Sequence, residues 1–416
     1  MIDETGIPPG PTNPGIPPGP TNPGIPSGGP AVPTNPVLEE LPSYFTQPLT
    51  DALDREALID LSIGDPHEPT PPAVRRALID AVTPSSSYPS AVGQPELREA
   101  IADWVGRRHG VEVDPDRHVL ASAGSKEAIF HLPLAVIDAT GSRPGVLWGQ
   151  PGYPVYDRGT RFAGGVSDPV TLRPDQGWRL DLADLPAERL ARTSIAWLNY
   201  PHNPTGATTD RAHLRRQLEV AREHRLLLAS DECYQEIWFD EPAPSILEVC
   251  DGDLTGVIAI VSLSKRSGMT GYRSGAMIGD PTLIARLRRL RTTTGTASPS
   301  FVQAAAAAAW CDQDHVDERR AIFAAKRQVL LSFLTQQGFE VSGSEATFYL
   351  WVRAPGGDDA AYAEALMRAG LLVTPGRSFG VGGEGWLRLA LVPTVEECHL
   401  AVQRWAAAIA EGRLPT

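Results

Sequence analysis

The chain has 416 residues, and its 37 lysines and arginines against 50 aspartates and glutamates give a formal net charge of −13. This acidic balance argues against a general nucleic-acid-binding protein, which needs a basic surface to displace counterions from phosphates. No apolar run reaches the roughly 18 residues that span a bilayer, and no basic stretch followed by an apolar core marks a secretory leader. We therefore expect a cytoplasmic protein with neither a nucleic acid nor a membrane as its partner.

The N-terminal segment is a proline- and glycine-rich repeat. Residues 6–14 read GIPPGPTNP, residues 15–23 repeat this string, and residues 24–36 are a degenerate third copy. Such a composition has no position that can anchor a core, so we expect residues 1–37 to form a disordered tail. The tail would be a dispensable linker, the product of a misassigned start codon, or a docking arm.

Beyond the tail, short apolar runs alternate with amphipathic stretches, which is typical of an α/β protein. Most of the runs are bounded by Gly, Pro or Asp, as in a mostly parallel sheet that is covered on both faces. The predicted strands are Val119–Ala121, Gly145–Trp148, Ser194–Asn199, Leu226–Ser230, Val257–Ser262 and Ala276–Ile278. The predicted helices of this part are Arg211–His224, Pro281–Arg291 and Phe301–Trp310.

The C-terminal part mixes helices and strands in a different order, which indicates a smaller α+β domain. Its predicted strands are Phe348–Val352, Leu371–Val373 and Trp386–Ala390, and its predicted helices are Asp359–Ala369 and Thr394–Glu411. We therefore divide the chain after the tail into three parts. They are a segment over residues 38–75 that packs with the small domain, a large domain over residues 76–297, and the small domain over residues 298–416.

The four cysteines are not spaced as metal ligands. Cys233, Cys250, Cys311 and Cys398 never stand at CxxC spacing, and no histidine lies at zinc-finger distance from such a pair. We expect four reduced thiols, mostly buried, and no metal ion.

The most informative motif is VSLSKRSGMTGYRSG over residues 261–275. Lys265 follows a strand end, close to Ser262 and Ser264, and so is expected at the carboxyl edge of the sheet, where open α/β folds bind ligands. Desolvation and the nearby Arg273 would lower the pKa of Lys265 towards that of a nucleophilic amine. The motif therefore predicts a reactive lysine, with a structural lysine as the alternative.

Two further motifs place polar side chains at strand ends. NYPHNPTG over residues 199–206 leaves a strand into a proline- and glycine-containing turn that presents Asn203. LASDECY over residues 228–234 puts Asp231 at the end of an apolar strand, where an unpartnered carboxylate is costly. Both side chains are expected at the same edge of the sheet as the lysine; a plain turn and a buried helix cap are the alternatives.

Two more segments are expected to meet anions. ASAGSKEA over residues 121–128 is a strand-to-helix turn whose free backbone N–H groups form an anion site. WLRLA over residues 386–390 carries Arg388 between apolar neighbours on a strand, where a guanidinium either faces solvent or binds an anion.

In this order along the chain, the motifs resemble those of the fold-type I pyridoxal-phosphate enzymes, the class I and II aminotransferases, over roughly residues 38–412. The resemblance implies a large domain with a mostly parallel, seven-stranded type of sheet, a smaller α+β domain, and pyridoxal 5′-phosphate as cofactor. It implies that Lys265 holds the cofactor covalently and that Asp231 pairs with its pyridine nitrogen, which keeps the ring an electron sink. Asn203 and Tyr234 would contact the 3-hydroxyl oxygen.

The resemblance also implies how the phosphate and the ring are held. The phosphate would lie among Gly124, Ser125, Lys126, Ser262, Ser264 and Arg273. Lys126 departs from the family, which often has a threonine or another small residue at this place. Tyr153 in QPGYP would stack on the cofactor ring, or else pack against its own loop.

The remaining implied contacts concern the substrate and a second subunit. Arg388 would bind the substrate α-carboxylate, with Asn203 and with Gly64 in LSIGDP close by. Tyr88 in SSSYPSAVGQPELREA resembles the tyrosine that reaches the cofactor phosphate of a neighbouring subunit. We therefore expect a homodimer with shared active sites, whereas an ordinary loop aromatic is the alternative for Tyr88.

The implied activity is a ping-pong transamination between an amino acid, glutamate in the first place, and a 2-keto acid. The run SLSKRSGMTGYRSG is most similar to N-succinyldiaminopimelate and related diaminopimelate-pathway aminotransferases. N-Succinyl-2-amino-6-ketopimelate is therefore the expected acceptor. A distal carboxylate would need a second cationic site, for which Arg98, His202 and Arg377 are unranked candidates.

Other functions stay open. Broad-specificity amino-acid aminotransferases share all of these motifs, and fold-type I lyases or oxidases use the same lysine, aspartate and arginine. A cofactor-binding regulator would need a DNA-binding module before the domain, where the proline- and glycine-rich tail stands instead. A purely structural protein would not need the lysine, aspartate, asparagine and arginine together.

Overall fold

The structure is a computed structural model, and it describes residues 35–39, 58–85 and 87–415. The chain forms two compact units, Met1–Glu56 and Ala57–Thr416. In the first unit the described element is the short helix α1 (Pro36–Glu39). The tail predicted for residues 1–37 therefore lies almost entirely outside the described residues.

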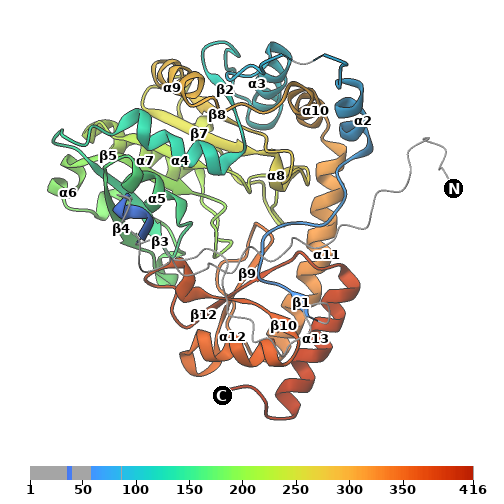
Figure 1. Cartoon of the computed structure of the whole chain (residues 1–416). Coiled ribbons are helices and arrows are strands. Elements are labelled where there is room, and N and C mark those ends of the chain that lie inside the picture. The colour runs from blue at the N-terminus through green and yellow to red at the C-terminus, as the bar shows by residue number, and fades with distance from the viewer. Residues whose placement is uncertain (1–34, 40–57, 86, 416) are drawn as a thin grey trace, which may run out of the picture. The chain divides into compact units, whose positions relative to one another are not determined.

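The second unit contains a large sheet that, within the described residues, has seven strands in the order β2-β8-β7-β6-β5-β3-β4 (Figure 1). The strands are β2 (Val119–Ser122), β3 (Gly145–Gln150), β4 (Val166–Thr171), β5 (Thr193–Asn199), β6 (Leu227–Asp231), β7 (Val257–Ser262) and β8 (Gly275–Gly279). β8 pairs antiparallel with both β2 and β7, and the pairs from β7 across to β4 are parallel. This confirms the expected mostly parallel sheet.

Apolar side chains alternate between the two faces along the central strands, because successive strand residues point to opposite sides. One face packs on α4 (Ser125–Val136), α5 (Val155–Phe162) and α9 (Pro281–Thr294). The other packs on α2 (Pro72–Asp80), α3 (Pro95–His109), α7 (Arg211–His224) and α10 (Ser300–Cys311). In β7, for example, Ile258 and Ile260 belong to the first cluster, and Val257, Ala259 and Val261 belong to the second. A strand buried on both faces has to be apolar throughout, which is why these strands were visible in the sequence.

The edge strand β4 is absent from the strands predicted above. Its residues VSDPVT are exposed or half-buried, and Pro169 stands inside it. Proline is tolerated on an edge strand, where one side needs no ladder hydrogen bond. A strand with so little buried apolar surface leaves no strong pattern in the sequence.

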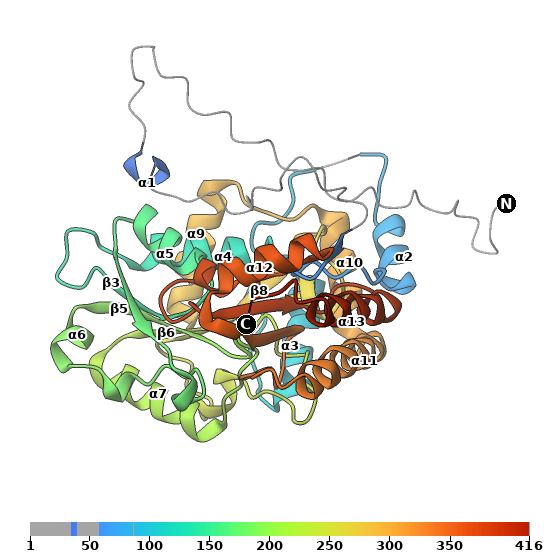
Figure 2. The same ribbon diagram turned by 90° about the horizontal axis from the view of Figure 1, so that it is seen from below.

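A smaller sheet lies in the C-terminal part, with the order β11-β12-β9 and antiparallel pairing among the described residues. Its strands are β9 (Tyr349–Arg353), β11 (Thr374–Pro375) and β12 (Trp386–Ala390). The helices α11 (Asp314–Gln336), α12 (Asp359–Arg368) and α13 (Val395–Ala410) share a hydrophobic core with it, and α11 packs along α13 (Figure 2). This is the expected α+β arrangement.

The first described stretch after residue 57 reaches the C-terminal part. β1 (Ile59–Asp60) pairs in parallel with β10 (Leu371–Leu372), and the Ala390 N–H donates to the Leu61 carbonyl at 2.6 Å. The helix α10, in contrast, packs on α2 and α3 and contributes to the core beside the large sheet. The division at residue 297 stays a prediction, and the packing of α10 favours a boundary within α11 (Figure 1).

No helix among the described residues is long and apolar enough to cross a membrane. Cys233, Cys250 and Cys398 are buried, Cys311 is exposed, and all four are free thiols.

Candidate active site

Lys265 lies in α8 (Leu263–Arg266), a single short turn that directly follows the buried strand β7. Ser262 caps this turn, because its Oγ accepts a hydrogen bond from the Ser264 N–H at 3.1 Å. The Lys265 Nζ donates to the backbone carbonyl of Gly64 and lies 5.6 Å from the centroid of the Phe348 ring. The amine is therefore held at the carboxyl edge of the large sheet, as expected for a ligand-binding residue.

The environment of Lys265 favours its neutral form. Burial lowers the pKa of Lys265 to about 8; the nearby positive charges of Arg388 and Arg273 also lower it, whereas the negative charge of Asp65 raises it. An amine with this pKa has a substantial neutral fraction close to neutral pH. The neutral amine is the nucleophilic form, so the side chain is suited to covalent chemistry with a carbonyl group.

Asp231 is the last residue of β6 and is only 4% exposed. Its Oδ2 accepts a hydrogen bond from the Tyr156 hydroxyl at 2.7 Å, and its Oδ1 accepts one from the Cys233 N–H at 3.3 Å. Burial raises the pKa of the Asp231 carboxyl, and the hydrogen bonds from Cys233 and Tyr156 act in the opposite direction. The carboxylate is thus desolvated and well suited to meet a cationic ring nitrogen.

Arg388 comes from β12 of the small sheet and is 8% exposed. One terminal nitrogen donates to Asn203 Oδ1 at 3.0 Å, and the other donates to the Ser62 carbonyl at 2.7 Å. Its guanidinium carbon lies 4.4 Å from the ring centroid of Tyr349 and 4.6 Å from that of Phe379. Within the described residues its Nε is buried without a hydrogen-bond partner, so a donor remains for an anion.

Gly64 and Tyr234 both lie against Tyr349. The hydroxyls of Tyr234 and Tyr349 are 3.0 Å apart, and a Cβ built on Gly64 would overlap the Tyr349 hydroxyl. Burial raises the pKa of Tyr234 well above its usual value, so its hydroxyl stays protonated. The residue at position 64 therefore has to be glycine for the chain to pass this close to the tyrosine pair.

The turn before α4 forms a cationic cradle. Gly124 precedes the helix with a φ of 84°, and a Cβ at this position would come within 2.6 Å of the Arg273 guanidinium. Arg273 donates to the carbonyls of Thr270, at 2.8 Å, and Ala123, at 3.2 Å. Burial is the main cause that lowers the pKa of Lys126, and the positive charges of Arg273 and Arg158 lower it further. Together with the N–H groups of the first turn of α4, which no side chain caps, this cradle fits a phosphate.

Ser125, Tyr153 and Tyr88 differ in their relation to the site. Ser125 begins α4 and hydrogen-bonds the side chain of Cys233, beside Asp231. Tyr153 is half-buried and meets Tyr156 edge to face, with centroids 5.8 Å apart and an interplanar angle of 80°. Tyr88 is fully exposed. Its expected contact is with a second subunit, so its role stays a prediction.

The three candidates for a distal carboxylate site are engaged elsewhere or uncharged. Arg98 pairs with Asp116, and Arg377 pairs with both Asp358 and Asp359. Burial lowers the pKa of His202 to about 3, so this side chain is neutral at physiological pH. The structure therefore does not support any of them as the second cationic site.

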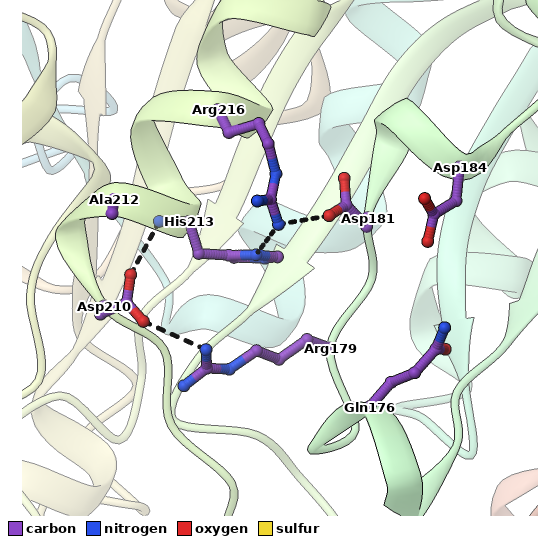
Figure 3. Close-up of a pocket in the computed structure, with 8 residues that line it drawn as sticks. All are labelled: Gln176, Arg179, Asp181, Asp184, Asp210, Ala212, His213 and Arg216. Atoms are coloured by element: carbon purple, nitrogen blue, oxygen red, sulfur yellow. Dashed lines mark hydrogen bonds and ion pairs between the residues drawn. The ribbon is translucent and has the colours of Figure 1, made fainter.

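Figure 3 shows a polar pocket of about 400 Å³ that shares no residue with the site above. It lies between the start of α7 and the short helices η2 (Pro174–Gln176) and η3 (Leu182–Asp184). Its two arginines already have carboxylate partners, since Arg179 pairs with Asp210 and Arg216 pairs with Asp181. The pocket therefore offers no strong electrostatic reason to bind an anion.

Sequence reasoning did not identify Tyr156, Cys233, Tyr349 or Phe379. Tyr156 stands three residues after Tyr153, close to one helical turn away, and Cys233 stands two residues after Asp231. These spacings were the only sequence signals that could have linked Tyr156 and Cys233 to the site. Aromatic and cysteine residues near a buried strand usually belong to the core, so the signals were weak. Their contacts with Asp231 and Arg388 became visible only in three dimensions.

Comparisons with known proteins show the family to which the chain belongs. The model of the family Aminotransferase class I and II matches residues 56–404. The LL-diaminopimelate aminotransferase of Desulforudis audaxviator (strain MP104C) is 38% identical over 371 residues, which cover 86% of this chain and 93% of that protein. The 4-dedimethylamino-4-oxo-anhydrotetracycline transaminase OxyQ of Streptomyces rimosus is also 38% identical, over 88% of this chain and 99% of that protein.

Solved structures give the same result. An aminotransferase from Neisseria meningitidis Z2491 has a TM-score of 0.84 at 32% identity, over 90% of this chain and 99% of that one. A probable N-succinyldiaminopimelate aminotransferase from Thermus thermophilus has a TM-score of 0.78 at 32% identity, over 85% and 97% of the two chains. The lysine, the buried carboxylate and the phosphate cradle fit pyridoxal 5′-phosphate. The chain therefore belongs to the class I and II aminotransferases, and it is a pyridoxal-phosphate-dependent transaminase of fold type I.

Proposed function

We propose that the chain moves an amino group from an α-amino acid, glutamate in the first place, to a 2-keto acid by a ping-pong mechanism. One observation carries this proposal. Lys265 Nζ and Arg388 donate to the carbonyls of Gly64 and Ser62, respectively, two residues apart in the chain. A reactive amine and a buried guanidinium are therefore held against the same short segment, where the positive charge of Arg388 also lowers the pKa of Lys265.

In this proposal the chain's own residues divide the work. Arg388 orients the substrate through its α-carboxylate, and Asn203, which already accepts a hydrogen bond from Arg388, completes that contact. The neutral Nζ of Lys265 removes the proton from the substrate α-carbon, since the substrate is held close to it. Pyridoxal 5′-phosphate, when bound, supplies a ring that takes up the electron pair left on that carbon.

The cofactor contacts are part of the same proposal. Asp231 would hold a proton on the ring nitrogen, Asn203 and Tyr234 would contact the 3-hydroxyl oxygen, and Tyr153 would cover the ring. The phosphate would lie against Gly124, Ser125, Lys126, Ser262, Ser264 and Arg273. The cationic crowding around Lys126 and the small Gly124 support this placement.

For the substrate, we propose an acceptor of the diaminopimelate type, such as N-succinyl-2-amino-6-ketopimelate. The similar proteins support this choice, because several are LL-diaminopimelate aminotransferases and one solved structure is a probable N-succinyldiaminopimelate aminotransferase. The engagement of Arg98 and Arg377 with aspartates indicates that a distal carboxylate would be recognised by other groups.

A half-reaction screen tests the proposal. Single amino acids are mixed with the loaded protein, and loss of the bound cofactor's visible absorbance is followed. We expect glutamate and N-succinyl-LL-2,6-diaminopimelate, the amine that corresponds to the proposed acceptor, to give one equivalent of keto product, and Lys265→Ala to give none at any concentration. Formation of keto acid or another product without transfer of the amino group to the cofactor would instead indicate lyase or oxidase chemistry.

We also propose a homodimer in which Tyr88 reaches the neighbouring phosphate cradle. This ring is fully exposed, and so in large part are the apolar side chains of Ile79 and Val82, a few residues earlier in the chain, which supports an interface here. Light scattering of the purified protein tests this, because a monomer at micromolar concentration would contradict it. The cytoplasmic location stays a prediction.

A further inference from the structure

The carboxylate of Asp231 is held from both sides by neutral side chains to which none of the roles above is given. The Tyr156 hydroxyl donates to Oδ2 at 2.7 Å, and the Cys233 thiol donates to Oδ1 at 2.7 Å. The backbone N–H of Cys233 adds a third hydrogen bond at 3.3 Å. Two donors on opposite oxygens fix the rotation of the carboxylate.

Tyr156 is itself immobilised by aromatic packing. It is 2% exposed, its ring stacks on Trp197 at 4.9 Å and 29°, and it contacts Trp148 at 6.1 Å. It also meets Tyr153, which belongs to the loop just before α5. One short segment therefore carries both the aromatic ring proposed to cover the cofactor and the hydroxyl that reaches Asp231.

The Tyr156 hydroxyl affects the protonation state of Asp231. Burial by itself raises the pKa of Asp231, and the hydrogen bonds from Cys233 and Tyr156 lower it. Burial and the negative charge of Asp231 raise the pKa of Tyr156 well above its usual value, so the phenol remains a donor. A carboxyl that became protonated could no longer attract a protonated ring nitrogen, so the two donors keep Asp231 in its useful form.

We propose that Tyr156 is a positioning residue, whose hydroxyl holds the buried carboxylate of Asp231 ionised and in one orientation towards the cofactor ring, with Cys233 as a weaker second donor. The inference rests on the proposed pairing of Asp231 with the ring nitrogen. Tyr156 acts through Asp231 and touches neither substrate nor reacting atoms. The thiol ranks second because S–H is a weak donor.

The test compares Tyr156→Phe with Tyr362→Phe. Tyr362 is a buried tyrosine of the small part whose hydroxyl accepts a hydrogen bond from Trp405 at 3.3 Å, so both variants lose one buried hydroxyl. We expect Tyr156→Phe to weaken the affinity of the cofactor-free protein for pyridoxal 5′-phosphate by about tenfold or more, the usual scale for a hydrogen bond to a charged group. Tyr362→Phe should bind as tightly as the wild type.

A double-mutant cycle separates positioning from a general loss of structure. In an Asp231→Asn background, Tyr156→Phe should cause no further loss of affinity, because the charge it supports is gone. An infrared band of a protonated carboxyl group should appear in cofactor-free Tyr156→Phe at neutral pH and disappear in the double variant. An equal loss of affinity in both backgrounds would show a merely structural role and overturn the inference.

The outcomes also separate this inference from the proposed function. If the wild type binds no pyridoxal 5′-phosphate, the proposed function fails. If the wild type and Tyr156→Phe bind it equally tightly, only the present inference fails. Should Tyr156→Phe not fold, the variants Cys233→Ala and Cys233→Ser provide the test. We expect Cys233→Ala to weaken cofactor binding and Cys233→Ser, which keeps a hydrogen-bond donor, to preserve it. Equal affinities of the two variants would overturn the inference.

Discussion

The protein has two candidate anion sites, and they are built in opposite ways. Arg388 is buried, lies between two aromatic rings, and bonds a side chain and a carbonyl from distant parts of the chain. Arg273 is exposed and donates to two backbone carbonyls, one three residues away at Thr270 and one at Ala123, just before α4. A desolvated guanidinium interacts more strongly with an anion than a solvated one. With the roles proposed above, this comparison predicts that Arg388 decides selectivity for the carboxylate, and that Arg273 shares the binding of phosphate with other groups of the cradle.

The largest effect is expected at the buried site. Arg388→Lys keeps the positive charge but loses the planar, two-pronged donor, so kcat/KM for the amino acid should fall about a hundredfold, or roughly 3 kcal/mol. Steady-state kinetics measure this fall. Affinity for pyridoxal 5′-phosphate should stay within about threefold of the wild type, since other groups hold the cofactor. A comparable loss in both quantities would break the distinction between the two sites.

A smaller effect is expected at the exposed site. Arg273→Ala should weaken cofactor affinity by about tenfold, because backbone N–H groups and Lys126 would still hold the phosphate. At saturating cofactor, kcat/KM should remain near the wild-type value. Arg286→Ala provides the control, since Arg286 is an exposed arginine of α9 outside the cradle. Equal affinities for the two variants would remove Arg273 from the cradle.

The smallest effect concerns the influence of both arginines on Lys265. The neutral amine of Lys265 is the reactive form, and the pKa of Lys265 is about 8. Cofactor uptake by the cofactor-free protein should therefore accelerate as the pH rises through about 8. Removing a nearby positive charge makes protonation easier. The midpoint should therefore move to higher pH in Arg388→Gln, and less so in Arg273→Gln, while burial keeps it below the ordinary value for lysine. Stopped-flow absorbance measures the midpoint, and a shift to lower pH would contradict this account.

Much of the fold was predictable because its central strands are buried on both faces. The range expected for the helix Arg211–His224 is the range observed, since Asp210 caps its first turn through the His213 N–H. β4 was not predicted, because its residues are exposed or half-buried and one of them is proline. Lys265, Asp231, Asn203 and Arg388 were visible because each is polar at or near a strand that is otherwise apolar.

The sequence by itself determined the central strands of the large sheet and several helices, and which polar groups are expected where ligands bind. Only the tertiary structure decided what those groups touch: Arg388 meets Ser62 across 326 residues and Asn203 across 185, and Tyr156 meets Asp231 across 75. Periodicity and turn chemistry are local, extending over a few residues. Contacts over these separations depend on strand order in the large sheet and on how the small sheet packs at its edge, neither of which leaves a local pattern.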